Sequence, residues 1–417
     1  MQARNQLKLS IVHVVDATHR VFGGPLCPSL RFTAMTSAPQ ADQALGESIA
    51  RVLRGFVPEW ADDRPALPYG GTRDVAFVEL PIPRLVQWVL KECLGAKDGG
   101  RWEKVAWIFW FTYRDRPFNL AFTKFGLRLS GSAESDEEFA ELANEIVRKL
   151  DAAARIAERE AFQPFADQQV AAGSVTILND SRRLREMYEY FRATAEEGVS
   201  DEEIQVLERG NGFIRLFVRD EHRFRYSVAL VEAYFGWLER VLVLCWPFCG
   251  YRPGVDDVRR FIGDHWGNKF KKLFDVSTDR EAKRHYDALR NLAEEYRNTF
   301  AHGGFGRHQR GILVHVPGGA PIEASLSDIR NRPHFEFAPI PEESLADIGE
   351  ALDAVDGWLR TGPVHFGMKW IEAGLDVPFD AKSVQEHAAA TGGGEDAFEM
   401  AMERWSDLAN QAANMDW

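Results

Sequence analysis

The segment "YRNTFAHGG" brings together three side chains that could act on a phosphate ester. Arg297 carries a permanent positive charge, and its planar fork of N–H donors suits a phosphate group. His302 is of the residue type that most readily moves protons near neutral pH. Asn298, four residues before it on a predicted helix, can hydrogen-bond the imidazole. A proton carrier beside a phosphate-binding cation is the pair that metal-free cleavage of RNA requires.

The spacing of this arginine and histidine is not rare in the chain, so its context must decide. Five of the eleven histidines follow an arginine by five residues, namely His265, His285, His302, His315 and His365. Three of these pairs contain a glycine or proline or span a strand-like run, and Arg280/His285 lies on a polar first turn of a predicted helix. Arg297/His302 alone lies at the end of a strongly amphipathic helix, where two glycines follow the histidine. The alternative interpretation is a capping histidine with a solvated arginine beside it.

The segments around this motif are predicted to be helical. Residues 223–246, stopped by Pro247, are apolar around most of the helix circumference, which is typical of the central helix of a bundle. A short basic helix "WGNKFKKLF" and the motif helix follow. The core stripe of the motif helix is predicted to be Leu289, Ala293, Tyr296 and Phe300. Residues 305–342 carry short strand-like runs and are interpreted as an insertion, after which a closing helix ends near residue 362.

The N-terminal part alternates strand and helix signals. Strands are expected at "KLSIVHVV" and "RDVAFVELPI", helices at "QALGESIARVLRGF" and "PRLVQWVLKECL", and a hairpin around the turn that begins at Arg114. Capping boxes at Ser135–Glu138 and Ser200–Glu203 should begin two further helices. The predicted organisation is an α+β domain over 1–165, a helical connector over 166–220, a helical bundle over 221–362 and a tail over 363–417, in which "AAATGGG" is interpreted as a linker before a terminal helix.

Composition narrows the function classes. The net charge of −13 argues against general coating of nucleic acid, although residues 251–310 carry a local net charge of +4, from 13 Lys and Arg against 9 Asp and Glu. No nucleotide-binding loop, zinc-protease motif or hydrolase elbow is visible, and no metal site or cofactor is expected. The four cysteines are interpreted as buried thiols of a cytoplasmic protein. The longest apolar run is interrupted by charged residues, so no membrane span is expected.

The motif residues Arg297, Asn298 and His302 resemble the R-[N/D/H]-x3-H signature of HEPN domains, which are all-helical modules common in prokaryotic toxins and antiviral ribonucleases. The order of a long apolar helix, a "GNKFKKLF" connector, the motif helix and a closing helix is also similar to that family. The resemblance covers roughly residues 220–362. It implies an all-α HEPN-like helical bundle and leaves the N-terminal half unexplained. With the patterns described above, the predicted fold is an α+β N-terminal domain followed by an all-α HEPN-like helical bundle with a small β-rich insertion.

The resemblance also implies a function. It implies a metal-independent endoribonuclease that leaves a 2′,3′-cyclic phosphate, with Arg297, Asn298 and His302 as catalytic residues, acting in anti-phage (abortive infection) defence. It implies a homodimer with facing motifs, and we expect a protein or phage trigger to act on the N-terminal domain. Family members often place an acidic residue of the preceding helix on the motif arginine, and either Glu232 or Glu239 could serve. The basic connector adds three weaker candidates for RNA binding, Lys269, Lys271 and Lys272.

One departure from the family concerns control of the activity. HEPN toxins that are silenced by a nucleotidyltransferase carry a tyrosine two residues after the histidine, and here Gly304 stands at that position, which argues against control by AMP transfer to that tyrosine. The alternative function is a non-catalytic HEPN adaptor that binds RNA or a protein partner.

Overall fold

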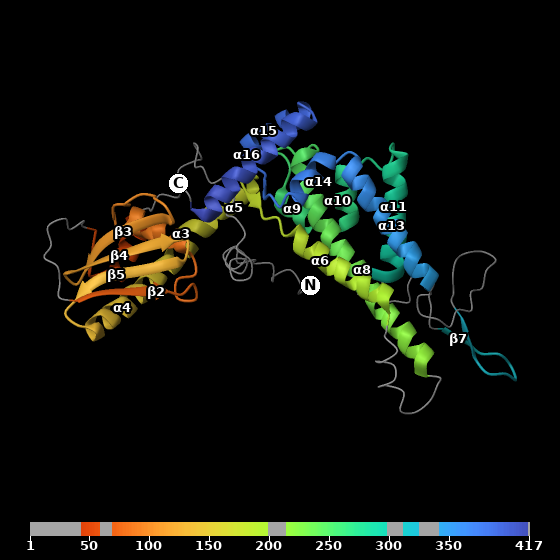
Figure 1. Cartoon of the computed structure of the whole chain (residues 1–417), viewed down its shortest axis with the longest axis horizontal. Helices are drawn as coiled ribbons and strands as arrows, with labels where there is room; N and C mark the ends of the chain where they lie inside the picture. The colour runs from red at the N-terminus through yellow and green to blue at the C-terminus, as the bar shows by residue number, and fades with distance from the viewer. Residues whose placement is uncertain (1–42, 59–68, 199–213, 298–311, 325–341, 416–417) are drawn as a thin grey trace. The chain divides into compact units, whose positions relative to one another are not determined.

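The computed structural model describes residues 43–58, 69–198, 214–297, 312–324 and 342–415 (Figure 1). The chain divides into two compact units. Unit 1 comprises Met1–Ala171 and Met400–Trp417, and unit 2 comprises Ala172–Glu399.

Unit 1 is built on a five-stranded antiparallel sheet with strand order β1-β3-β4-β5-β2. Trp107, Phe109 and Phe111 alternate along β3, and all three belong to one buried core with Phe139 and Ile146 of α4. This alternation is the period of a strand with one face packed on helices. The elements are α2 (Gln43–Val52), β1 (Phe56–Val57), β2 (Tyr69–Val75), α3 (Pro83–Trp88), η2 (Val89–Cys93), β3 (Val105–Tyr113), β4 (Arg116–Thr123), β5 (Gly126–Ala133), α4 (Asp136–Ala157), η3 (Glu158–Phe162) and α5 (Gln163–Ala171).

Local signals in unit 1 explain most of these boundaries. The two residues between β3 and β4, Arg114 and Asp115, have positive φ angles of 48° and 60°, as a tight hairpin turn requires. The hydroxyl of Ser135 accepts a hydrogen bond from the Glu138 amide at the start of α4, so the N-cap of the first predicted capping box is confirmed. The Glu138 carboxylate accepts a hydrogen bond from the amide of Glu134, one residue before the N-cap, and not from that of Ser135 as a capping box requires. The second capping box and the predicted strand "KLSIVHVV" lie outside the described residues.

One strand prediction was wrong in its position. The strand expected at residues 73–82 is β2, which ends at Val75, and the chain then turns, with the Glu79 carboxylate accepting a hydrogen bond from the Ala76 amide at 3.1 Å. The strand begins earlier, at Tyr69, and its next two residues are glycines, which carry no strand signal. At Gly71 a Cβ would lie 2.6 Å from the Phe139 ring, so glycine is required for α4 to pack directly on β2.

Unit 2 is mainly helical, with two small antiparallel strand pairs, β6–β9 and β7–β8. The predicted central helix is confirmed and begins earlier than expected, as α8 (Ile214–Cys245). The other elements are β6 (Thr176–Ile177), α6 (Ser181–Glu197), η4 (Trp246–Phe248), α9 (Val258–Gly263), α10 (Trp266–Leu273), α11 (Arg280–Leu292), η5 (Ala293–Arg297), β7 (Ile312–Val314), β8 (Ile322–Ala324), α13 (Glu342–Thr361), α14 (His365–Glu372), β9 (Val377–Pro378), α15 (Ala381–Gly392) and α16 (Glu395–Asn414). The residues of α16 before Met400 belong to unit 2 and the rest to unit 1.

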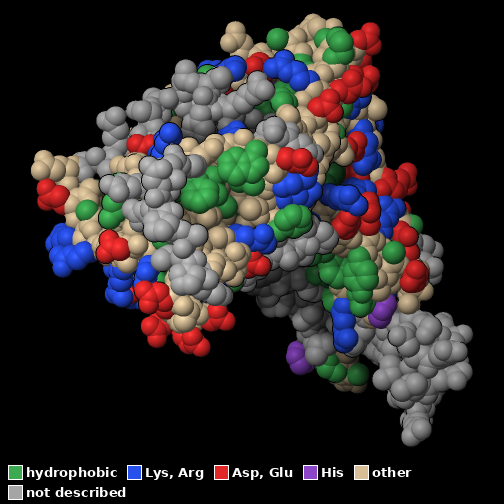
Figure 2. Space-filling model, turned by 60° about the vertical axis from the view of Figure 1, so that its left-hand side comes forward, with side chains coloured by type: hydrophobic (Ala, Val, Ile, Leu, Met, Phe, Trp, Pro, Cys, Tyr) green, Lys and Arg blue, Asp and Glu red, His purple; other side chains and the backbone are tan. Residues whose placement is uncertain are grey.

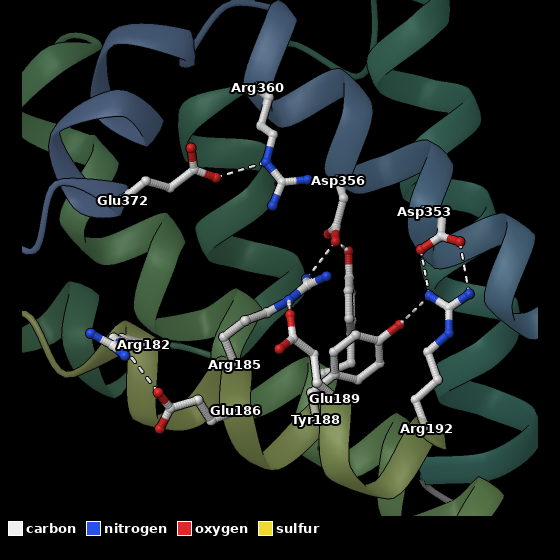
Figure 3. Close-up of polar contacts among 11 residues, drawn as sticks. Arg182, Arg185, Glu186, Tyr188, Glu189, Arg192, Asp353, Asp356, Arg360 and Glu372 are labelled. Atoms are coloured by element: carbon white, nitrogen blue, oxygen red, sulfur yellow. Dashed lines mark hydrogen bonds and ion pairs between the residues drawn. The ribbon is translucent and has the colours of Figure 1, made fainter. Parts of the chain in front are cut away.

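A buried polar network joins α6, α8 and α13 (Figure 3). The Asp356 side chain of α13 is 3% exposed, pairs with Arg185 of α6 and accepts a hydrogen bond from the Tyr234 hydroxyl of α8 at 2.8 Å. Two turns further along α6, Arg192 pairs with Asp353, with Nη2 and Oδ2 2.8 Å apart. The guanidinium of Arg185 also lies over the Trp237 ring, 4.9 Å from its centroid. Because α6 is fixed to the bundle in this way, it is part of unit 2 rather than the separate connector that the sequence suggested.

The C-terminal tail predicted over 363–417 is likewise not a separate segment. α14 and α15 belong to unit 2, and "AAATGGG" is not a linker, because its first residues continue α15 as far as Gly392. Alanines are strong helix formers, which explains why the helix extends into this run. Phe398 of α16 is fully buried against Phe248 and Trp370.

The predicted insertion contributes the hairpin β7–β8, whose connecting residues 315–321 are exposed. Of the cysteines within the described residues, Cys245 is buried and Cys93 and Cys249 are partly buried, all as free thiols. Over the same part of the chain, none of the helices combines the length and apolar character that spanning a membrane would need.

The Asp356 network provides a test of what holds α6 in place. Asp356→Asn should lower the free energy of unfolding by roughly 3 kcal/mol, because it leaves the part-buried Arg185 with only the more exposed Glu189 as a counter-charge. The matched control is Arg182→Ala on the same helix, whose pair with Glu186 is exposed at both ends and should change stability by less than about 0.5 kcal/mol. Chemical denaturation of both variants measures the difference. Equal effects would show that the network does not hold α6.

A second test uses His387, which is 2% exposed and packs against the rings of Phe248 and Trp370. Burial lowers the pKa of His387 to about 4, with Asp380 opposing. The folded chain therefore binds fewer protons than the unfolded chain between about pH 4 and 6.5, and stability falls as the pH drops through this window. Between pH 7 and pH 5 this group should cost about 2 kcal/mol, measured by denaturant titration. His387→Asn should remove that share of the pH dependence, whereas His315→Asn, at an exposed position, should leave it.

Candidate active site around Arg297

Arg297 is positioned by the end of the motif helix. Asp279 caps the N-terminus of α11, where its carboxylate accepts hydrogen bonds from the amides of Glu281 and Ala282. The predicted core stripe is confirmed for Leu289, Ala293 and Tyr296, which are all buried. α11 then continues into η5, a single π-helical turn that ends at Arg297. Such turns change the direction of the following side chains and recur at functional sites.

One face of α8 receives the Arg297 side chain. Its Nε lies 3.3 Å from an oxygen of Glu232, and its Nη1 donates to Glu239 at 3.1 Å. The two glutamates are seven residues apart, which is close to two full turns, so they lie on one face of the helix. Phe235 lies between them, and the guanidinium carbon is 5.2 Å from the centre of its ring. Both glutamates named from the sequence thus contact Arg297.

A second cation shares one of these carboxylates. Lys269 of α10 is 3% exposed, and its Nζ lies 3.0 Å from the Glu239 oxygen that does not bind Arg297. Glu239 therefore bridges a buried lysine and the arginine, while Glu232 is 39% exposed. The four charges sum to zero. Lys269 offsets one carboxylate, so the two glutamates do not leave the site with a net negative charge.

His265 lies at the edge of this cluster. It is the N-cap residue of α10, four residues before Lys269 and thus on the same side of the helix, and its ring is exposed. The Gly267 amide donates a hydrogen bond to Nδ1 at 3.3 Å. Partial burial lowers the pKa of His265, the charge of Arg297 lowers it further and that of Lys269 adds a little, while Glu239 opposes the shift.

The sequence analysis missed His265, because Gly263 interrupts the pair that it forms with Arg260. Its position just before the amphipathic "WGNKFKKLF" was the signal that could have found it. The interpretation of His285 as part of a polar first turn was also wrong. His285 is 3% exposed and stacks on the Trp358 ring at 4.9 Å, and burial, followed by the charge of Arg284, lowers its pKa.

The other predicted site residues have different outcomes in the structure. Asn298 and His302 lie outside the described residues, so their place beside Arg297 stays a prediction. Lys269 is buried and cannot present its charge to RNA, which corrects its assignment as an RNA-binding residue. Lys272 pairs with Asp256 at 3.0 Å, and the Lys271 amino group lies 4.8 Å from the centre of the Tyr286 ring. The three lysines differ in burial and in their partners because they lie on different sides of a short helix.

The wider surface has no single basic patch on the face drawn in Figure 2, where Lys and Arg side chains are interspersed with Asp and Glu. Within the described part of the chain, no group of three or more His, Cys, Asp or Glu side chains is arranged to hold a metal ion.

Comparisons with models of protein families, with curated proteins and with solved structures find no match to this chain. The resemblance to HEPN domains therefore rests on the motif and on the order of elements around it.

The unequal burial of the two glutamates leads to a prediction about stability. Glu239→Gln should lower the free energy of unfolding by about 3 kcal/mol, because it leaves the buried Lys269 without a counter-charge. Glu232→Gln should cost less than about 1 kcal/mol, because Glu232 is more exposed and Arg297 keeps Glu239. Urea denaturation of both variants measures the two values. A larger loss for Glu232→Gln than for Glu239→Gln would contradict the assignment of Glu239 as the bridging carboxylate.

Proposed function

We propose that the chain is a metal-independent endoribonuclease of the HEPN type, with Arg297, Asn298 and His302 as its catalytic residues and a role in anti-phage (abortive infection) defence. The observation that carries the proposal is the setting of Arg297. The first residue of the motif is held by two carboxylates and an aromatic ring of the long helix α8. An arginine held in a fixed orientation is pre-organised to bind a charged group, because little side-chain entropy remains to be lost.

The charges at the site suit a phosphate. Nε and Nη1 of Arg297 face the carboxylates, and neither of these two contacts involves its Nη2. A phosphate oxygen can bind at this amino group. The buried Lys269 supports this binding, because it offsets the charge of Glu239 and keeps the cluster from repelling an anion.

The reaction follows from the chemistry of RNA. The ribose 2′-oxygen attacks the adjacent phosphorus and loses its proton, the bond from phosphorus to the 5′-oxygen breaks, and the leaving oxygen takes up a proton. The products are a 2′,3′-cyclic phosphate and a 5′-hydroxyl. His302 serves as the general base or acid, Arg297 stabilises the charge that develops on the phosphate oxygens, and Asn298 orients the imidazole.

The proposal extends to assembly and control. Two chains pair through their bundles as a homodimer, so that two motifs form one composite site, and the N-terminal α+β unit receives a protein or phage trigger. In a symmetric pair the same surface of each chain forms the contact, which places two copies of one motif near a two-fold axis. Light scattering of the active protein tests the assembly, and full activity as a monomer would contradict it.

Cleavage itself is tested with purified protein and single-stranded RNA. His302→Ala and Arg297→Ala should each reduce the rate by about 10²- to 10⁴-fold, since each removes proton transfer or charge stabilisation. His315→Ala is the matched control, because it removes an exposed histidine with the same spacing from an arginine and should leave the rate unchanged. Cleavage should persist in EDTA and should require a 2′-hydroxyl.

Several results would overturn the proposal. Loss of cleavage in EDTA, or equal cleavage of DNA, would exclude the mechanism. In cells, RNA should be degraded on expression of the wild type and intact on expression of His302→Ala. If wild-type protein cuts no RNA even with extract from phage-infected cells, the adaptor function replaces the enzyme.

A further inference from the structure

His265 adds a polar hydrogen to the edge of the Arg297 cluster. It caps α10, and one turn later the same helix provides Lys269, which meets Glu239 at 3.0 Å. Glu239 in turn binds Arg297 at 3.1 Å. His265 is exposed, whereas Lys269 is buried, so of these two residues of α10 the histidine is the one that a ligand can reach.

The hydrogen bond at Nδ1 fixes the state of this ring. Because the Gly267 amide donates to Nδ1, that nitrogen must keep its lone pair, and the proton of the neutral ring is on Nε2. A second proton on Nδ1 would break this bond. The neighbouring charges of Arg297 and Lys269 act in the same direction, since they lower the pKa of His265 beyond the effect of burial, with only Glu239 opposing. The lowered pKa favours the neutral ring, whose Nε2–H is a hydrogen-bond donor on an exposed residue.

We propose that His265 is a second phosphate-contacting residue of the Arg297 site, with its Nε2–H donating a hydrogen bond to a phosphate oxygen of bound RNA. The identity of the ligand rests on the proposed function. A neutral imidazole held as a donor by a helix N-terminus is an established way to contact a developing or existing negative charge. His265 would thus take the place in RNA binding that the buried Lys269 cannot fill.

The test distinguishes the role of the His265 Nε2–H as a hydrogen-bond donor from the role of His265 as the N-cap of α10. His265→Asn retains a good N-cap acceptor but lacks the ring Nε2–H, so the fold should be kept, as a thermal unfolding midpoint would show. His265→Ser, a second capping variant, serves if the asparagine variant does not fold. His315→Asn is the matched control, with the same substitution at an exposed histidine of unit 2 outside the cluster.

The probe is a fluorescent single-stranded RNA with 2′-O-methyl groups throughout, which the chain can bind but not cut. His265→Asn should weaken its binding by about 10- to 100-fold in fluorescence anisotropy, and His315→Asn should leave it unchanged. The salt dependence gives a second measurement. Arg297→Ala should reduce the slope of log affinity against log salt by about 1, whereas His265→Asn should not change it, because a neutral donor displaces no counterion.

The outcomes are distinct. Wild-type affinity in folded His265→Asn, a reduced salt slope in that variant, or no binding of the probe by the wild type would each overturn this inference. If the variant binds weakly as expected but the wild type never cuts unmodified RNA, then the proposed nuclease activity fails and the phosphate contact stands. If unmodified RNA is cut and His265→Asn binds like the wild type, then the contact fails and the activity stands.

Discussion

The Arg297 guanidinium is shared by two carboxylates that lie two turns apart on α8, and the geometry of unit 2 around the motif depends on that sharing. The glutamates can meet one arginine only if η5 runs along the face of α8 that carries Phe235. Lys269 also restricts the position of α10. A lysine that is 3% exposed requires a counter-charge, and Glu239 of α8 supplies it. α8, α10 and η5 are therefore fixed relative to one another by one carboxylate.

The same helix fixes a second set of elements on another side. Tyr234, the residue before Phe235, donates to Asp356 and so contributes to the network that holds α6 and α13. Neighbouring residues on a helix point about 100° apart, which allows one segment of α8 to take part in both networks. Polar contacts on two sides, separated by buried apolar residues, explain why α8 is apolar around most of its circumference yet carries Glu232 and Glu239.

Sequence patterns were sufficient where local chemistry decides the structure. The central helix, the capped start of α4 and the turn at Arg114 and Asp115 each carry their own signal in adjacent residues. The sequence patterns failed where a residue far away in the chain decides the position of an element. β2 contains a glycine, Gly71, that is needed for the approach of Phe139, and α6 joins unit 2 through Asp356, more than 160 residues away. At the site, Glu232 and Glu239 were candidates because of the resemblance to HEPN domains, whereas the burial of Lys269 depends on how α10 packs.

The division of the chain has a consequence for the order in which the protein is made. Unit 1 is interrupted in sequence by the whole of unit 2, and Met415 belongs to its buried core. A ribosome releases the sheet and α4 long before the residues that complete this core, while every segment of unit 2 has emerged by then. Because chains fold in part as they are synthesised, unit 2 can reach its native structure before unit 1 does. In a nascent chain, the contacts of Arg297 with α8 would thus form before the other unit is whole.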